Sequence, residues 1–224
     1  MSCLWCFESI IQKHTWSTIF TLSEMKGLCP VCRDSLMRLQ ANRCTRCSRE
    51  SASEVCSDCL VWEQQGQFLD WNVSVFKYEG AVRDMLYKWK YRGDYELGYA
   101  FKREYSKGFA EVRKRAGKNA VIVPVPLSEE RLRERGFNQA EMLADFLKGK
   151  KTAVLKRRHS EKQSKKSRSE RLASKNPFQM QESIQTPVIL VDDIYTTGST
   201  LHQAAAVLKQ NGAPFIAGYT LIRS

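Results

Sequence analysis

The chain has 224 residues, of which 42% are hydrophobic and 27% charged, and its formal net charge is +12 at pH 7. This composition is ordinary for a soluble globular protein with one α/β domain and a small extra module. No apolar run approaches the roughly 20 residues that span a bilayer, and residues 1–6 lack the basic and apolar regions of a signal peptide. We therefore expect a cytoplasmic protein without membrane insertion.

All eight cysteines lie in the first 59 residues, as four C-x-x-C pairs: Cys3 and Cys6, Cys29 and Cys32, Cys44 and Cys47, and Cys56 and Cys59. In a cytosolic chain thiols stay reduced, so this pattern predicts metal binding. Two intervening residues let one tight turn present both sulfur atoms to a tetrahedral ion at about 2.3 Å. We predict two structural zinc ions in closed four-cysteine sites, within a zinc-ribbon module over residues 1–62.

The spacing leaves the pairing of these cysteines open. Sequential pairing puts the first four on one zinc ion and the last four on the other, and interleaved pairing is the alternative. Closed sites have no open position for catalysis, so we interpret the metal as a replacement for a core too small to stand alone. Contact of the ribbons with nucleic acid or protein is the other interpretation.

The elements after the cysteines begin with a strand at 70–78, where apolar residues alternate. Residues 80–91 are expected to form a helix, because Val82, Met85, Leu86 and Trp89 make an apolar stripe. Residues 87–92 look like an aromatic and basic platform for nucleic acid, but the stripe predicts that Trp89 is buried. Another helix is expected over 95–115, ending at Gly117.

Strands and helices then alternate to the end of the chain. We expect strands at 120–126, 152–155, 187–191 and 214–222, helices at 138–148 and 198–210, and a charged loop from Arg131 to Gly136. The short apolar strands are typical of a buried parallel sheet. The pattern predicts an α/β domain over residues 68–224, with a doubly wound parallel sheet and helices on both faces.

The net charge is concentrated in one stretch. Residues 150–175 carry 11 basic and 2 acidic groups, a net charge of +9. Such a segment attracts phosphate-rich partners, and a solvated loop without a partner is the alternative. We expect a flexible basic segment at 156–175, in which the candidate nucleic-acid contacts are Lys162, Lys165, Lys166 and Arg168.

Residues 188–200 carry the most specific pattern, in which four branched apolar residues lead into two acids, a loop of small hydroxyl residues and a helix. In an open α/β sheet, ligands bind at the carboxyl ends of the strands. The free N–H groups of a helix start hold phosphate, and Gly198 allows close approach of the backbone. Adjacent carboxylates suit vicinal sugar hydroxyls and a magnesium ion. The segment therefore predicts a phosphorylated sugar as ligand.

This segment resembles the phosphoribosyl pyrophosphate motif of type I phosphoribosyltransferases, and the whole chain resembles the ComF family of competence proteins, close to its ComFC type. The likeness includes the cysteine pairs and the segments 90–94, 123–127, 135–140, 162–164, 170–172 and 188–200. It implies a phosphoribosyltransferase-like fold and a cytoplasmic part in natural transformation, acting on incoming single-stranded DNA. Other DNA-uptake proteins, such as a competence helicase, are implied partners.

The same resemblance implies roles for individual residues. Asp192 and Asp193 would bind the ribose hydroxyls, and Mg²⁺ would accompany the pyrophosphate. The loop of Thr196, Thr197, Gly198, Ser199 and Thr200 would hold the 5-phosphate. The stretch after Val125 corresponds to the pyrophosphate loop, where nucleobase enzymes use small residues and this chain has Arg131, Arg133 and Arg135. Arginine binds phosphate with two parallel hydrogen bonds, but the altered loop leaves turnover open.

Three hypotheses follow. In the first, a DNA-uptake factor binds phosphoribosyl pyrophosphate and contacts single-stranded DNA through the basic segment. In the second, the chain is a nucleobase phosphoribosyltransferase of salvage metabolism. In the third, a zinc-ribbon adaptor keeps an old enzyme fold as a scaffold. The two acids and the complete hydroxyl loop argue against a scaffold, while the zinc module and the basic segment argue against salvage. We favour the first. The sequence identifies no nucleobase pocket and no catalytic residue.

Overall fold

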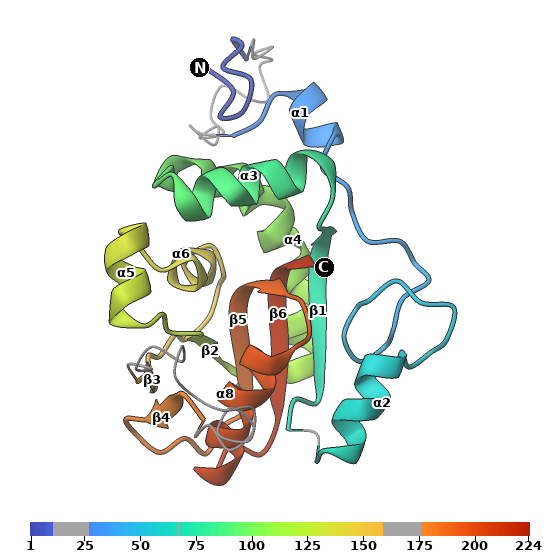
Figure 1. The fold of residues 1–224 in the computed structure, drawn as a ribbon, viewed down its shortest axis with the longest axis vertical. Helices are drawn as coiled ribbons and strands as arrows, with labels where there is room; N and C mark the ends of the chain where they lie inside the picture. The colour runs from blue at the N-terminus through green and yellow to red at the C-terminus, as the bar shows by residue number, and fades with distance from the viewer. Residues whose placement is uncertain (11–26, 67, 159–175) are drawn as a thin grey trace, which may run out of the picture.

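A computed structural model of the chain describes residues 1–10, 27–66, 68–158 and 176–224. Its centre is a four-stranded parallel sheet in the order β1-β6-β5-β2, shown in Figure 1. The strands are β1 (Trp71–Lys77), β2 (Val121–Pro124), β5 (Val188–Tyr195) and β6 (Ile216–Arg223). The last strand of the chain, β6, therefore lies inside the sheet, and all of its residues are buried. The predicted parallel sheet is confirmed.

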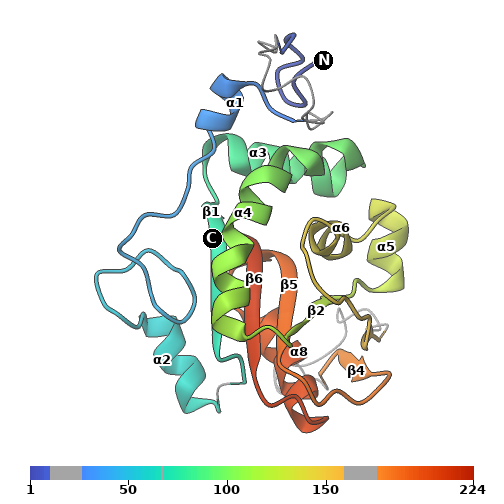
Figure 2. The same ribbon diagram turned by 180° about the vertical axis from the view of Figure 1, so that it is seen from behind.

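Helices cover both faces of the sheet, as expected. The helix α4 (Tyr99–Ala116) lies on one face and α8 (Ser199–Gln210) on the other, as Figures 1 and 2 show from opposite sides. The other large elements packed into the α4 side are α3 (Gly80–Tyr91), the 3₁₀ helix η1 (Tyr95–Gly98) and α6 (Gln139–Asp145). The predicted helices at 80–91, 95–115 and 138–148 correspond to these elements.

Alternation along the strands divides the core into two layers. Ile122, Ile189 and Ala217 are register partners across the sheet, and all belong to the core under α4. Their strand neighbours Val121 and Val188 belong to the core under α8. Because both layers are apolar, the strands show the continuous hydrophobic runs typical of a buried parallel sheet.

Two local expectations were wrong. The stretch predicted as a charged loop contains the helix α5 (Glu129–Arg135), because Ser128 accepts a hydrogen bond from the amide of Arg131 at its start and Gly136 ends it with φ of 77°. The strand expected at 152–155 is instead β3 (Leu155–Arg157). It pairs antiparallel with β4 (Phe178–Met180), which was not predicted, in a separate two-stranded sheet.

The cysteines lie in two separate places. The first group, next to α1 (Pro30–Asp34), lies beyond α3, whereas the second surrounds the start of α2 (Ser57–Gln64) beside β1 (Figures 1 and 2). Leu4 and Trp5 pack against the core under α4, and the second group of cysteines belongs to the core under α8. Within the described ranges, no helix combines the length and apolar character needed to cross a bilayer.

Candidate functional site

The cysteines form two groups that fit zinc. Cys3, Cys6, Cys29 and Cys32 make one group, and Cys44, Cys47, Cys56 and Cys59 the other, with the sulfur atoms of each group within 4.8 Å of one another. The grouping is therefore the sequential one. Sγ–Sγ distances of 3.6 to 3.8 Å within these groups match the separation of about 3.8 Å that zinc–sulfur bonds of about 2.3 Å require in a tetrahedron. They are too long for disulfides.

Hydrogen bonds to sulfur support the same assignment. The amide of Cys56 donates to Sγ of Cys44 at 3.4 Å, and that of Cys29 donates to Sγ of Cys3 at 3.3 Å. A hydrogen bond from Cys59 and the nearby positive charge of Arg223 lower the pKa of Cys47 to about 5, against the effect of burial. A thiolate is the form that binds metal, and Cys47 is the member of the second group whose thiolate is favoured, whereas burial raises the pKa of Cys56 and the hydrogen bond to Cys47 raises that of Cys59.

The 196–200 loop lies between β5 and α8. The side chains of Thr196, Thr197 and Ser199 are exposed, and that of Thr200 is half-buried. Oγ1 of Thr197 and Oγ of Ser199 lie 2.9 Å apart, so these two hydroxyl groups already lie together. The first amide groups of α8 have no partner within the helix. The loop therefore gathers hydroxyl and amide donors at one point, which suits an anion.

Gly198 is required by the shape of this loop. It lies immediately before α8 with φ of 85°, in the left-handed region. A Cβ atom added to Gly198 would lie 2.2 Å from Oη of Tyr195 and 2.5 Å from its Cζ. Glycine is the residue that takes this conformation without strain and leaves room for the ring.

The two acids lie within β5 rather than beyond it, because the ladder to β6 continues through Asp192 and Ile194. Asp193 is 6% exposed, and its Oδ2 lies 2.8 Å from Nζ of Lys90 and 3.9 Å from Nη1 of Arg135. Burial and the neighbouring charge of Asp193 raise the pKa of Asp192 to about 7, while Lys90 acts in the opposite direction. Asp193 is therefore paired with Lys90, whereas Asp192 is the acid with a pKa of about 7.

The three arginines predicted for the pyrophosphate loop do not lie together. Arg135 has a side chain only 12% exposed and points toward Asp193. Arg133 points away, since its side chain is 81% exposed and lies 4.0 Å from Glu129 of the same helix. Arg131 is exposed near Arg157 of β3, where burial and then the charges of Arg131 and Arg135 lower the pKa of Arg157. Arg157 is thus influenced by the charges of both Arg131 and Arg135.

The segment Arg-Gly-Phe-Asn-Gln-Ala at 135–140 explains how Arg135 is held. Gly136 ends α5, and Asn138 begins α6 by accepting a hydrogen bond from the amide of Ala140 at 3.0 Å. Gln139 is buried, and its Oε1 accepts a hydrogen bond from Nη1 of Arg135 at 3.0 Å. The segment is therefore a turn between two helices that fixes one guanidinium group beside an acid of β5.

The sequence reasoning missed Lys90, Arg157, Trp62 and Arg223. Lys90 had a usable signal, because it follows Leu86 by four residues and so falls on the apolar stripe of α3, where a charge needs a partner. Arg223 likewise ends an otherwise apolar strand. Trp89 is fully buried, as the stripe predicted. Its neighbours on α3, Tyr87 and Tyr91, are 55% and 65% exposed, and their ring centroids are 5.3 Å apart.

The nucleic-acid candidates Lys162, Lys165, Lys166 and Arg168 lie outside the described residues, as does most of the basic segment. Of that segment the structure describes β3 and Arg158. Arg157 is half-buried and lies over the ring of Phe178 at 5.3 Å. The described start of the segment therefore packs on β4, and Arg157 is influenced by the charge of Asp192.

Comparison with known proteins adds the following. The chain is 40% identical to the competence protein ComFC of Bacillus subtilis, over 99% of this chain and 95% of that protein. It is 31% identical to ComFC of Streptococcus pneumoniae over the full length of both, and 28% identical to the DNA utilization protein YhgH of Salmonella typhimurium over 88% and 91%. No protein-family model matches.

Among solved structures, a crystal structure of hypoxanthine phosphoribosyltransferase from Staphylococcus aureus is similar. It has a TM-score of 0.36 and 14% identity, over 55% of this chain and 63% of that chain.

Proposed function

This chain belongs to the ComFC family of competence proteins, and we propose that it serves DNA uptake in the cytoplasm by binding phosphoribosyl pyrophosphate with Mg²⁺ and single-stranded DNA. The observation that carries the first ligand is the order of groups along one edge of the sheet. Hydroxyl and amide donors at 196–200 come first, then two carboxylates, then three arginines with a lysine. This order matches a phosphate, a sugar and a pyrophosphate.

At the first end, the 5-phosphate would bind the 196–200 loop. The exposed hydroxyl groups of Thr197 and Ser199, 2.9 Å apart, would donate to phosphate oxygens. Gly198 would let the backbone approach closely, and the dipole of α8 would favour the negative charge. Neither Asp192 nor Asp193 lies in the 196–200 loop, because both belong to β5, which ends at Tyr195. The loop therefore has no carboxylate of its own to repel the phosphate.

In the middle, Asp192 and Asp193 would accept hydrogen bonds from the ribose hydroxyl groups. Mg²⁺ prefers oxygen ligands and combines one or two carboxylates with substrate phosphates, so Asp192 and the ligand's own oxygens would hold it and it would neutralise the pyrophosphate. Burial and the charge of Asp193 raise the pKa of Asp192, and a bound cation would offset both effects.

At the far end, Arg131, Arg135 and Arg157 would bind pyrophosphate, with Lys90 behind them. Burial, and after it the charges of Arg131 and Arg135, lower the pKa of Arg157, so these positive groups repel Arg157 without a ligand. A polyanion would relieve that repulsion and accept several charge-assisted hydrogen bonds. Arg133, which pairs with Glu129, has no part in this proposal.

For single-stranded DNA, the support is the charge of residues 150–175 and the surface of α3. Proteins that bind single-stranded nucleic acid without sequence preference place basic side chains along its backbone and aromatic rings against its bases. The exposed rings of Tyr87 and Tyr91 supply such a stacking surface, and the guanidinium carbon of Arg135 lies 5.7 Å from the ring of Tyr91. Single-stranded DNA would thus contact α3 and also the basic segment, at Lys162, Lys165, Lys166 and Arg168.

Titration calorimetry with magnesium phosphoribosyl pyrophosphate tests the first ligand. We expect saturable binding by the wild-type chain and its loss in the double variant Asp192→Asn, Asp193→Asn, with the fold retained by circular dichroism. Asp84→Asn, an exposed acid on α3, is the control and should bind as the wild type does. Equal affinity in the double variant would refute the assignment.

The same samples separate binding from turnover. Incubation with nucleobases and a pyrophosphate assay would detect the transferase alternative, since transfer to a base breaks the bond between C1 and pyrophosphate and releases the latter. Release with any nucleobase would make phosphoribosyl pyrophosphate a substrate and the chain a salvage enzyme. We expect binding without such release.

A further inference from the structure

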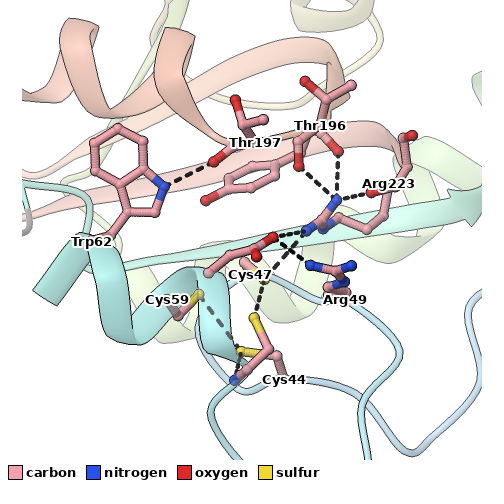
Figure 3. A network of polar contacts seen from close by, with 12 residues as sticks. Cys44, Cys47, Arg49, Cys59, Trp62, Thr196, Thr197 and Arg223 are labelled. Carbon is pink, nitrogen blue, oxygen red and sulfur yellow. Dashed lines mark hydrogen bonds and ion pairs between the residues drawn. The ribbon is translucent and has the colours of Figure 1, made fainter.

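The second group of cysteines and the 196–200 loop are joined by two side chains, drawn in Figure 3. Nη1 of Arg223 donates to the carbonyl oxygens of Tyr195 at 3.0 Å and of Thr196 at 2.8 Å. Its Nη2 lies 3.7 Å from Sγ of Cys47. Nε1 of Trp62 donates to the carbonyl oxygen of Thr197 at 2.8 Å. Three successive carbonyl groups are therefore held from the side of the cysteines.

The position of Trp62 depends on the cysteines through α2. This helix begins directly after Cys56, contains Cys59 and carries Trp62 three residues later. The ring of Trp62 also stacks on His202 of α8, with centroids 4.0 Å apart and planes 6° apart. Closed zinc sites contribute their binding energy to local folding. A zinc ion bound by these cysteines would therefore also fix the position of Trp62, which donates the hydrogen bond to the carbonyl oxygen of Thr197.

Arg223 is fixed in the same way. It is 3% exposed at the end of β6, with its guanidinium carbon 4.9 Å from the ring centroid of Tyr195. A buried guanidinium group needs compensating partners. Besides the two carbonyl groups, it has Sγ of Cys47 and, at 4.0 Å, a carboxylate oxygen of Asp58 on α2. Nη1 of Arg223 also donates to the carbonyl oxygen of Ser224, so Cys47 and Asp58 are the partners of this charge that come from the second group of cysteines and α2.

These contacts have a consequence for the amide groups of the loop. In a trans peptide the C=O and N–H of one unit point in opposite directions, and none of the described peptide bonds is cis. The carbonyl groups of Tyr195, Thr196 and Thr197 point to Arg223 and Trp62. The N–H groups of Thr196, Thr197 and Gly198 therefore point away from the cysteines, and successive amides on one side form an anion-binding concavity.

We propose that Arg223 and Trp62 are positioning residues that couple the second zinc site, and not the first, to the anion-binding shape of the 196–200 loop. Loading of Cys44, Cys47, Cys56 and Cys59 with zinc would then be a condition for binding the 5-phosphate, a consequence that rests on the proposed function. The first group lies beyond α3, away from this loop (Figure 1). It provides a matched control.

The coupling is tested without ligand by amide hydrogen exchange of peptides that cover 196–204, in which the amide of His202 donates to the carbonyl oxygen of Gly198, in protein of known zinc content. Trp62→Phe keeps an aromatic ring on His202 and removes one donor, so we expect exchange about fivefold faster. Arg223→Lys keeps the positive charge but loses the planar guanidinium group that donates to the two carbonyl oxygens. Cys47→Ser is expected to lose one zinc ion. Both variants should accelerate exchange more than Trp62→Phe does. Cys29→Ser also loses one zinc ion and should leave this loop unchanged, as should Arg49→Ala, whose exposed side chain contacts Asp58.

Two results would overturn the coupling. One is unchanged exchange at 196–204 in Trp62→Phe, Arg223→Lys and Cys47→Ser. The other is equal acceleration by Cys29→Ser and Cys47→Ser, which would indicate general destabilisation. Calorimetry with phosphoribosyl pyrophosphate then tests the consequence. We expect affinity to fall about fivefold in Trp62→Phe and further in Cys47→Ser, with Cys29→Ser unaffected. If the exchange results hold but the wild-type chain does not bind this ligand, the coupling stands and the proposed ligand is wrong.

Discussion

Lys90 and Asp193 form a buried ion pair, with Nζ 2.8 Å from Oδ2, that joins α3 to the end of β5. The side chains are 10% and 8% exposed, so solvent screens the pair little. The pair connects two segments that the sequence separates by more than a hundred residues. It fixes the position of one of the two proposed ribose ligands, and it makes the stability of the fold depend on the same acid.

Removing one partner of this pair should cost more than removing both. Among the described residues, Lys90→Met leaves Asp193 buried with Arg135, at 3.9 Å, as its remaining ion-pair partner, so we expect a loss of about 2–4 kcal/mol in urea unfolding. Adding Asp193→Asn should restore most of that loss. Lys107→Met, at an exposed position of α4, is the control. A double variant as unstable as Lys90→Met would contradict the pair's role.

Asp192 should make stability depend on pH near neutrality. Its pKa in the fold, about 7, is above its ordinary value of 3.8, so the folded chain keeps a proton that the unfolded chain has released, and this contribution to stability falls as pH rises from about 4 to 7. Asp192→Asn removes the effect. The variant should therefore gain stability relative to the wild type, by about 1 kcal/mol more at pH 8 than at pH 6, while it loses affinity for phosphoribosyl pyrophosphate. An equal difference at both pH values would argue against a raised pKa.

The purified chain should contain close to two zinc ions, and Cys29→Ser close to one. Because a closed site contributes its binding energy to folding, this variant should lose order in the first group of cysteines and become sensitive to protease there. Metal analysis of protein prepared under reducing conditions without chelator measures both. Metal-free protein that keeps its fold would refute the assignment.

Gly198→Ala should disrupt the 196–200 loop. A Cβ atom there meets Tyr195 at 2.2 Å in addition to the unfavourable φ, so we expect a loss of about 1–3 kcal/mol and of affinity for the phosphorylated ligand. Gly117→Ala has φ of 97° and no atom within 4 Å of the added Cβ. It therefore measures the backbone strain alone, and similar losses of stability in both variants would show that the contact with Tyr195 does not matter.

Replacing Lys162, Lys165, Lys166 and Arg168 with glutamine should weaken single-stranded DNA binding. Each lost phosphate contact reduces the slope of log affinity against log salt by about 0.7, so four contacts would change it by nearly 3. Replacing Lys107, Lys114, Lys118 and Lys148, all exposed, removes the same charge elsewhere. If only affinity for phosphoribosyl pyrophosphate falls, the segment covers that ligand instead, and if neither changes it is a solvated loop.

The sequence by itself determined the features that have local signals. The C-x-x-C spacing predicted two four-cysteine groups, and the run from Val188 to Thr200 predicted a strand, a loop and a helix start in one place. It failed where the signal was weak: the helix α5 was predicted as a loop because its seven residues are nearly all charged, and β4 was missed because three residues carry no periodicity. Even the pairing of the cysteines needed the structure.

Only the tertiary structure decided which side chains share an environment. Arg135 lies at Asp193 and Arg133 at Glu129, although both belong to one turn of α5, because the direction of a side chain depends on how the helix packs. Trp62 and Thr197 are 135 residues apart, and Arg223 and Cys47 are 176 apart. Local propensity acts over a few residues, whereas such contacts exist only after the sheet has brought the end of β6 beside α2 and the loop that leads into α8.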